Sequence, residues 1–292
     1  MTATVRPRIG VVSLTQGRRP ADLAEGLASL LAQTDVELDI VCVGNGGGPG
    51  ALPDGVRGIT LPENVGIPAG RNRGADLVTG EYVFFLDDDA TLPSPRFLAD
   101  AVEILRRDRG IGLLQPRVVD AGGAANPRRW IPRLRKGDPR DSSDVFSVWE
   151  GATLLPRDVF DACEGWGEPY FYAHEGIELA WRVWAQGRRA HYEGGLVVNH
   201  PAIDPARHDD YYRLNARNRV WLAKRNLPWP LVPVYVGSWT LVQLLRWGRS
   251  PAKLLPWLGG WREGWRTSPA GRRSIGWVTV GRMARAGRPP VI

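Results

Sequence analysis

The 292-residue chain is poor in cysteine, with only Cys42 and Cys163. Two distant thiols give neither a disulfide framework nor a cysteine-based zinc site. The N-terminus lacks the long apolar stretch of a secretory signal peptide, so we expect the main domain to stay in the cytoplasm. No internal repeat is visible. With 43% apolar and 24% charged residues, the composition is that of an ordinary globular protein.

Acidic residues are scarce at the C-terminal end, where Glu263 is the only one after Asp210. The net charge is +7, and seven of the thirteen tryptophans lie between Trp221 and Trp265, interleaved with arginine. Basic segments can contact phosphate of nucleic acid, nucleotide or anionic lipid. Tryptophan together with arginine is more typical of a membrane interface than of a DNA groove. We therefore expect peripheral association with the inner face of the cell membrane and no specific nucleic-acid partner.

Residues 226–245 carry one further apolar feature. They contain no charged side chain and are about long enough to cross a bilayer. Pro228, Pro230 and Pro233 interrupt them, which favours an amphipathic segment lying at the membrane surface over a true span. The remaining alternative is a buried helix of a soluble appendage.

Periodic apolar residues predict an alternation of strands and helices. Strands are predicted over residues 8–15, 38–43, 58–61, 82–86, 111–114, 146–155 and 196–198. Helices are predicted over 20–33, 68–78, 95–105 and 176–186, with further helices broken by prolines over 210–266 and a long loop over 120–144. This alternation predicts an α/β fold with a mostly parallel, doubly wound sheet flanked by helices. We expect residues 1–204 to form this domain and residues 205–292 to form a helical, Trp/Arg-rich extension.

Three consecutive carboxylates, Asp87, Asp88 and Asp89, directly follow the predicted strand 82–86. Such carboxylates repel one another, and a cation would neutralise them. Mg²⁺ and Mn²⁺ prefer oxygen ligands and usually share their coordination shell with substrate phosphates. Ligands of doubly wound sheets bind at the carboxyl ends of the strands, where Asn45 also lies. The alternative interpretation is a solvated acidic turn.

A second motif runs from Pro62 to Gly74 and contains Asn64, Gly66, Arg71 and Asn72. Its glycines allow close approach of the backbone, and the N-terminus of the following helix favours an anionic phosphate. The arginines would add charge-assisted contacts to a diphosphate. The same residue types also form ordinary turns.

Aromatic side chains surround carboxylates in a third region, which contains Trp149, Glu150, Gly151, Trp166, Tyr172, His174 and Glu175. Such a cluster suits a sugar-binding wall beside a general base. It equally suits an aromatic core patch beside a helix start that favours glutamate. His200 ends a predicted strand, where its imidazole would serve either as a structural hydrogen bonder or as a ligand of the same metal.

Taken in order, these motifs resemble those of the family 2 glycosyltransferases of the GT-A fold, including bacterial rhamnosyl- and galactofuranosyl-transferase-like members. The resemblance covers about residues 8–201. It is carried by Gly44-Asn45-Gly46, Asn64-Val65-Gly66, Arg71-Asn72-Arg73-Gly74, Asp87-Asp88-Asp89, Gly151-Ala152, Arg157, Phe160, Gly165-Trp166-Gly167-Glu168, Phe171, Glu175-Gly176-Ile177-Glu178-Leu179, Arg182, Gly187 and His200.

The resemblance implies a metal-dependent, inverting transfer of a sugar from a nucleotide-diphosphate donor to a hydroxyl of a lipid-linked or cell-envelope glycan. Asp89 and His200 would hold Mn²⁺ or Mg²⁺. The implied donor-binding residues are Thr15, Gln16, Asn45, Asn64, Gly66, Arg71, Asn72, Asp87 and Asp88. The implied acceptor-binding residues are Trp149, Glu150, Gly151, Trp166, Tyr172 and His174.

The sequence departs from the family pattern at two positions. Gly44 stands where the family usually has Asp, and Glu175-Gly176 stands for the usual Glu-Asp pair, whose Asp is the expected base. Glu175 is the first candidate for that role, and Glu178, about one helical turn on, is the second. The loss leaves open a nucleotide-sugar-binding module without turnover. A nucleotidyltransferase of related fold is a further alternative, for which Gly17-Arg18-Arg19 would supply the basic signature after the first strand.

Overall fold

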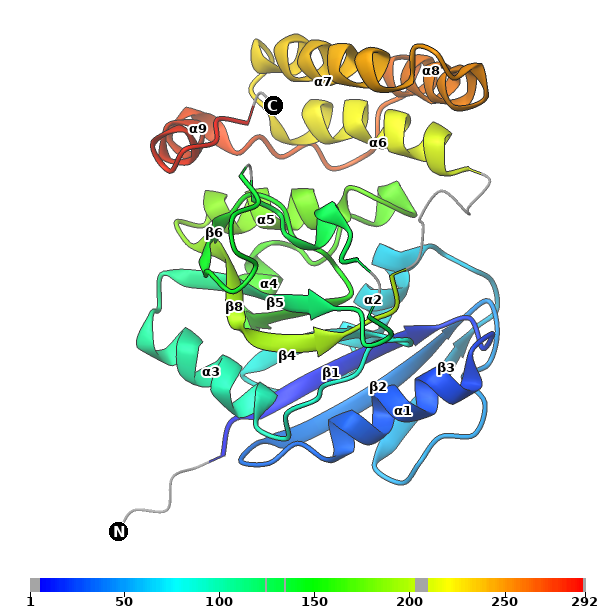
Figure 1. The fold of residues 1–292 in the computed structure, drawn as a ribbon, viewed down its shortest axis with the longest axis vertical. Helices are drawn as coiled ribbons and strands as arrows, with labels where there is room; N and C mark the ends of the chain where they lie inside the picture. Colours follow the sequence, from blue (N-terminus) through cyan, green and yellow to red (C-terminus); the bar gives the residue numbers. More distant parts are fainter. Residues whose placement is uncertain (1–5, 124, 134, 203–209, 291–292) are drawn as a thin grey trace.

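The computed structural model describes residues 6–123, 125–133, 135–202 and 210–290 (Figure 1). Its strands are β1 (Arg8–Thr15), β2 (Glu37–Asn45), β3 (Val56–Leu61), β4 (Tyr82–Asp87), β5 (Ile111–Val119), β6 (Ser143–Val145), β7 (Ala152–Pro156) and β8 (Arg189–Asn199). Its helices are α1 (Pro20–Leu31), α2 (Ile67–Ala75), α3 (Phe97–Arg107), α4 (Arg157–Ala162), α5 (Glu175–Ala185), α6 (Tyr211–Asn226), α7 (Leu231–Trp247), α8 (Pro251–Arg266) and α9 (Gly276–Arg285), with 3₁₀ turns η1 (Arg128–Trp130) and η2 (Glu168–Tyr170).

The strands form one sheet in the order β3-β2-β1-β4-β7-β5-β8-β6. β1 pairs in parallel with β2 and β4, β2 with β3, and β5 with β8. β7 runs antiparallel to both β4 and β5, and β6 antiparallel to β8. The predicted α/β class with a mostly parallel sheet and a helical C-terminal region is confirmed.

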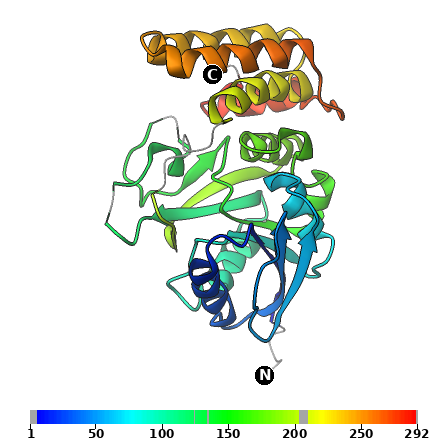
Figure 2. The ribbon, with the colours of Figure 1, turned by 90° about the vertical axis from the view of Figure 1, so that its right-hand side faces the viewer.

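Alternate residues of the central strands bury their side chains on opposite faces of the sheet. Ile9 and Val11 of β1 belong to the hydrophobic cluster that includes α1 and α3. Val12 of β1 and Phe85 of β4 belong to the cluster on the other face, which includes α2, α4 and α5. Both faces of the sheet are therefore covered (Figure 2), which explains why these strands read as continuous apolar runs.

The C-terminal helices form further layers above α5 (Figures 1 and 2). Val220 of α6, Tyr235 of α7 and Met283 of α9 belong to the same hydrophobic cluster as the upper face of the sheet. The predicted boundary at residues 204 and 205 lies outside the described residues, so the two-part division stays a prediction. Among the described helices, none combines the length and apolar character needed to cross a membrane.

One predicted strand, residues 146–155, is wrong in its first part. The ladder begins only at Ala152, and β6 ends at Val145. Between them the Trp149 N–H donates to the side chain of Gln115 at 2.7 Å instead of to a strand. These apolar residues are buried by packing without pairing in the sheet. The short strand predicted at 196–198 is the end of the longer β8, and α4 and α9 were not predicted.

Candidate active site

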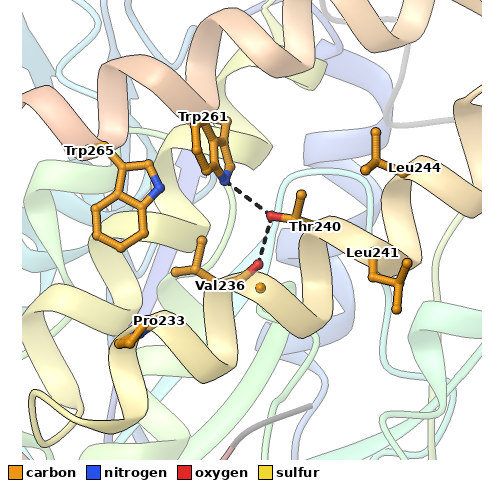
Figure 3. A pocket seen from close by; sticks show the side chains of 8 residues that line it. Pro233, Val236, Thr240, Leu241, Leu244, Trp261 and Trp265 are labelled. Carbon is orange, nitrogen blue, oxygen red and sulfur yellow. Dashed lines mark hydrogen bonds between the residues drawn. The ribbon is translucent and has the colours of Figure 1, made fainter.

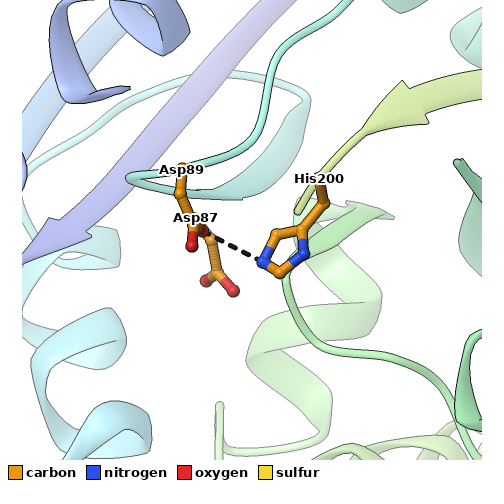
Figure 4. Close-up of side chains that lie close together, drawn as sticks. All are labelled: Asp87, Asp89 and His200. Atoms are coloured by element: carbon orange, nitrogen blue, oxygen red, sulfur yellow. Dashed lines mark ion pairs between the residues drawn. The ribbon is translucent and has the colours of Figure 1, made fainter. Parts of the chain in front are cut away.

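The C-terminal ends of β4 and β8 bring together Asp87, Asp89 and His200 (Figure 4). Their potential ligand atoms all lie within 4.8 Å of one another. Asp87 ends β4, and His200 directly follows β8. His200 Nε2 lies 3.0 Å from Asp89 Oδ1. Burial lowers the pKa of His200, although Asp87 opposes the shift, so the imidazole favours its neutral, metal-binding form. Two carboxylates and one imidazole suit Mn²⁺ or Mg²⁺.

The carboxyl group of Asp88 contacts Thr15 at the end of β1. Its Oδ2 accepts a hydrogen bond from the Thr15 hydroxyl at 2.6 Å, and burial raises the pKa of Asp88. Thr15 in turn accepts a hydrogen bond from the Gly17 N–H at 3.0 Å. Gln16, between them, is exposed. Asp88 and Thr15 therefore fix the loop after β1, and Gln16 lies at its surface.

Arg19, which the sequence reasoning did not assign to the site, pairs with both Asp88 and Asp89. Its guanidinium supplies positive charge to the acidic cluster without a metal. Gly17-Arg18-Arg19 was considered only as the signature of a nucleotidyltransferase. The basic residues directly after β1 are the sequence feature from which a role for Arg19 in the site could have been predicted.

The turn from Asn64 to Gly66 is held from β2 by Asn45. The Asn45 side-chain amide donates to Asn64 Oδ1 at 3.0 Å and to the Gly66 carbonyl at 3.1 Å, and its oxygen accepts from the Val65 N–H at 2.9 Å. Gly66 has a positive φ of 89°, and a Cβ there would lie 2.7 Å from the Phe171 backbone. Asn45 and Asn64 thus shape the start of α2, where the backbone N–H groups favour a phosphate.

Arg71 and Asn72 of α2 have different hydrogen-bond partners. Arg71 donates to Asp87 Oδ1 at 2.7 Å and lies over the ring of Trp166 at 5.0 Å. Asn72 instead bonds the Trp166 carbonyl and Glu168 at 3.0 Å each. Trp166 is only 1% exposed. The structure therefore brings Arg71 to the aspartates but places Trp166 beneath it in the core, which does not fit the predicted acceptor wall.

Trp149 and Gly151 lie against the metal-site residues. The Trp149 ring packs edge-on to His200 with centroids 4.8 Å apart. The Gly151 carbonyl accepts a hydrogen bond from the Asp87 N–H at 2.9 Å. A Cβ on Gly151 would come within 2.5 Å of the Asp87 carboxylate. A side chain at 151 would displace that carboxylate, so both neighbours of Glu150 border the site.

Glu150 and Glu175 form a pair of neighbouring carboxyl groups. Burial, followed by the charge of Glu150, raises the pKa of Glu175 to about 8. Burial also raises the pKa of Glu150, although Arg71 opposes the shift. Glu175 is 3% exposed, and its Oε2 has no hydrogen-bond partner in the described part of the chain. A carboxyl pair with raised pKa values is typical of proton-transfer sites.

The segment leading into α5 has an unusual backbone. Phe171, Ala173 and His174 all have positive φ angles, between 65° and 79°. His174 is buried, and neither of its ring nitrogens has a partner among the residues that the structure describes. Burial lowers its pKa well below the usual value. Burial raises the pKa of Tyr172, to which Glu175 and Glu150 add, so Tyr172 neighbours the carboxyl pair. Backbone strain of this kind gathers at functional sites.

Glu178, the second candidate base, is not brought to this group. It accepts hydrogen bonds from Tyr170 at 3.0 Å and from Asn226 at 2.6 Å, and it pairs with Arg182 at 3.2 Å and Arg225 at 2.8 Å. Burial would raise its pKa, but the two arginines outweigh this and lower it. Its oxygens are occupied inside the fold, so this geometry argues against Glu178 as the base.

The model of glycosyl transferase family 2 matches residues 11–163, slightly more than half of the chain. The chain belongs to this family. It is therefore a glycosyltransferase of the GT-A fold that depends on a nucleotide-sugar donor, as the order of its motifs predicted. The matched segment contains the aspartates, Arg19, Arg71 and Glu150.

Relatives and a solved structure agree with this family. Over 230 residues the chain is 27% identical to the glucosyl-dolichyl phosphate glucuronosyltransferase of Haloferax volcanii, covering 68% of this chain and 70% of the relative. It is 27% identical over 184 residues to the O-antigen biosynthesis protein RfbC of Myxococcus xanthus, covering 56% of this chain but 14% of that longer protein. The mannosyltransferase PcManGT of Pyrobaculum calidifontis, in complex with GDP-Man and Mn²⁺, aligns with a TM-score of 0.57 at 18% identity over 99% of this chain and 78% of that one.

Proposed function

We propose that the protein is a metal-dependent, inverting glycosyltransferase acting on a lipid-linked or cell-envelope glycan. The observation that carries this proposal is the convergence of Asp87, Asp89 and His200 next to Arg71 and the carboxyl pair of Glu150 and Glu175. Metal ligands, a phosphate-binding cation and a proton acceptor then lie at one edge of the sheet, as transfer from a nucleotide sugar requires.

Asp87, Asp89 and His200 hold Mn²⁺ or Mg²⁺ in this proposal. Bound there, the metal supplies Lewis-acid stabilisation of the negative charge on the departing diphosphate. Arg71 and Arg19 add positive charge beside it, and the N-terminus of α2 offers backbone N–H groups. Asn45, Asn64 and Gly66 position that helix start.

The carboxyl pair accepts the proton of the acceptor hydroxyl. The acceptor oxygen then bonds to the anomeric carbon from the face opposite the diphosphate, which inverts its configuration. Tyr172 and Trp149 border the carboxyl pair and the metal site respectively, where an acceptor sugar would bind.

The outer helical layer supports a membrane or lipid partner. Exposed apolar side chains on α7, α8 and α9 include Leu241, Leu245, Leu255, Trp277 and Val278. A groove of about 350 Å³ between α7 and α8 is lined by Leu241, Leu244, Trp261 and Trp265 (Figure 3). Apolar surface next to many arginines suits an anionic membrane. The name of the Haloferax relative specifies a lipid-linked sugar phosphate.

Release of nucleoside diphosphate from a nucleotide sugar tests the proposal. Purified protein is incubated with UDP-glucose, UDP-N-acetylglucosamine, GDP-mannose or dTDP-rhamnose, with and without Mn²⁺, in the presence of polyprenyl phosphate or glucosyl polyprenyl phosphate. We expect one donor to be turned over only with metal, giving a product of inverted anomeric configuration by NMR. A donor that binds with metal but is not consumed under any condition would indicate a binding module instead.

A further inference from the structure

The carboxyl group of Glu150 lies against the backbone of Gly176. Glu150 Oε1 accepts a hydrogen bond from the Gly176 N–H at 3.0 Å. A Cβ built on Gly176 would lie 2.4 Å from that same oxygen and 2.7 Å from the carboxyl carbon of Glu150. The Val148 carbonyl oxygen would lie 2.5 Å from the same Cβ. The Glu150 carboxyl and this backbone oxygen together fill the volume into which any side chain at position 176 would extend. Position 176 of α5, which has no side chain, therefore receives a carboxyl group from the segment before β7.

Glu150 lies between two residues that border the metal site. Trp149 before it packs on His200, and Gly151 after it bonds the backbone of Asp87. Glu150 is half-buried, whereas Glu175 is 3% exposed. Of the two carboxyl groups, Glu150 is therefore the one more open to an incoming acceptor.

We propose, on the basis of the function proposed above, that Glu150 is the catalytic base and that Glu175 is a buried positioning residue beside it. Glu150 takes the proton from the acceptor hydroxyl while the acceptor oxygen forms its bond to the anomeric carbon. The bond from that carbon to the diphosphate oxygen breaks, and its electron pair leaves with the nucleoside diphosphate. Glu175 neighbours Glu150 and helps to fix the conformation in which its carboxyl caps Gly176.

The direct test compares Glu150→Gln with wild type. Glutamine keeps the size of the side chain and its acceptor for the Gly176 N–H, but it cannot take a proton. We expect kcat for nucleoside-diphosphate release to fall at least about 100-fold, while the Mn²⁺-dependent affinity for the donor stays within about threefold of wild type. In Glu175→Gln we expect a smaller fall in kcat. Glu103→Gln, at an exposed position of α3, is the control.

A second variant supplies an arm that does not depend on E150Q alone. Glu150→Asp keeps a carboxyl group at this position. We expect it to turn over donor at least about tenfold faster than E150Q, because its carboxyl group can still take a proton. Gly176→Asp should lose activity, because its Cβ would meet both the Glu150 carboxyl and the Val148 carbonyl oxygen.

The outcomes separate this inference from the proposed function. If kcat of E150Q stays within about fivefold of wild type, Glu150 is not the base. E150D no faster than E150Q would likewise overturn the assignment. If wild type itself neither binds nor turns over any donor with metal, the proposed function fails first.

Discussion

Arg19 and the proposed metal share the carboxylate of Asp89, and this competition has a measurable result. Arg19 pairs with Asp88 and Asp89, and the latter is a metal ligand in our proposal. Removing the guanidinium leaves these buried carboxylates without that positive charge, so a divalent cation should bind them more tightly.

We therefore expect Arg19→Gln to melt at a lower temperature than wild type without metal and to gain more stability from Mn²⁺ alone. Arg18→Gln, at the exposed neighbouring position, is the matched control and should behave as wild type. The measurement is the melting temperature across a Mn²⁺ titration without nucleotide. A Mn²⁺-induced shift that is equal in all three proteins would contradict competition at Asp89.

His191 on β8 gives a pH-dependent prediction away from the active site. Burial opposes its charged form, but hydrogen bonds to Asp144 and Glu193 outweigh burial and raise the pKa of His191 to about 9. The distance from His191 Nδ1 to Asp144 Oδ1 is 3.1 Å. Because the folded pKa lies above the usual value of 6.5, the stabilisation is complete below that pH and is lost as the pH rises through about 9.

The free energy of unfolding should therefore fall by roughly 3 kcal/mol from this group across that interval. In His191→Gln this contribution is removed, so its stability should depend less on pH than that of wild type. Urea unfolding of both proteins at several pH values measures the difference. Parallel pH profiles would show that the ring is not charged in the folded state.

Residue chemistry alone predicted site roles for the aspartates, Arg71, Glu175 and His200, because charged groups at strand and helix ends are visible in the sequence. It did not separate Glu178 from Glu175, since both lie in one helical turn. Only the packing of α6 brings Arg225 and Asn226 to Glu178. The contact of Glu150 with Gly176 joins segments 26 positions apart and leaves no sequence pattern.

At the scale of elements, Glu178 ties α5 to α6 and to the turn at Tyr170. Replacing it with glutamine leaves Arg182 and Arg225 buried without their counter-charge. Breaking a buried pair in this way costs roughly 3–5 kcal/mol, which corresponds to a decrease of roughly 5–15 °C in Tm.

Differential scanning calorimetry of Glu178→Gln measures this decrease, with the exposed Glu103→Gln as control. Because Glu178 lies outside the group of Asp87, Glu150 and Glu175, donor turnover below the melting transition should remain. A variant of wild-type stability that had lost turnover would instead return Glu178 to the role of base.

Strands and helices were predictable where one apolar period dominates. The run before Asp87 is buried on both faces of the sheet, and its strand was predicted to within one residue of β4. The segment 146–151 is also rich in apolar residues, but it lies outside the ladder. Its Trp149 N–H donates a hydrogen bond to the Gln115 side chain, and the Trp149 ring packs on His200. Such long-range partners override the local pattern.

At the scale of the whole molecule, α7 and α8 lie at the end opposite α1 (Figure 1). Their exposed apolar side chains include Leu241, Leu245 and Leu255. Leu245 is 78% exposed on α7, whereas Leu31 is 42% exposed at the end of α1. If the outer layer meets the membrane, Leu245→Glu should weaken binding to phosphatidylglycerol vesicles by roughly tenfold or more.

Leu31→Glu is the matched control and should bind as wild type. Co-sedimentation with phosphatidylglycerol and phosphatidylcholine vesicles measures both variants. Point substitutions suit this test better than truncation, because α6, α7 and α9 share the core of the transferase fold. Equal sedimentation of the two variants would remove the support for the outer layer as a membrane surface.

The central claim is a nucleotide site that depends on a metal held by Asp89. The most direct test is the thermal stability of wild type, Asp89→Asn and the exposed control Asp158→Asn with UDP, GDP and their sugars, each with and without Mn²⁺. The account predicts that wild type and D158N are stabilised by one nucleotide and Mn²⁺ together, and that D89N loses this joint effect. Stabilisation by nucleotide that is equal without Mn²⁺, or unchanged in D89N, would contradict it.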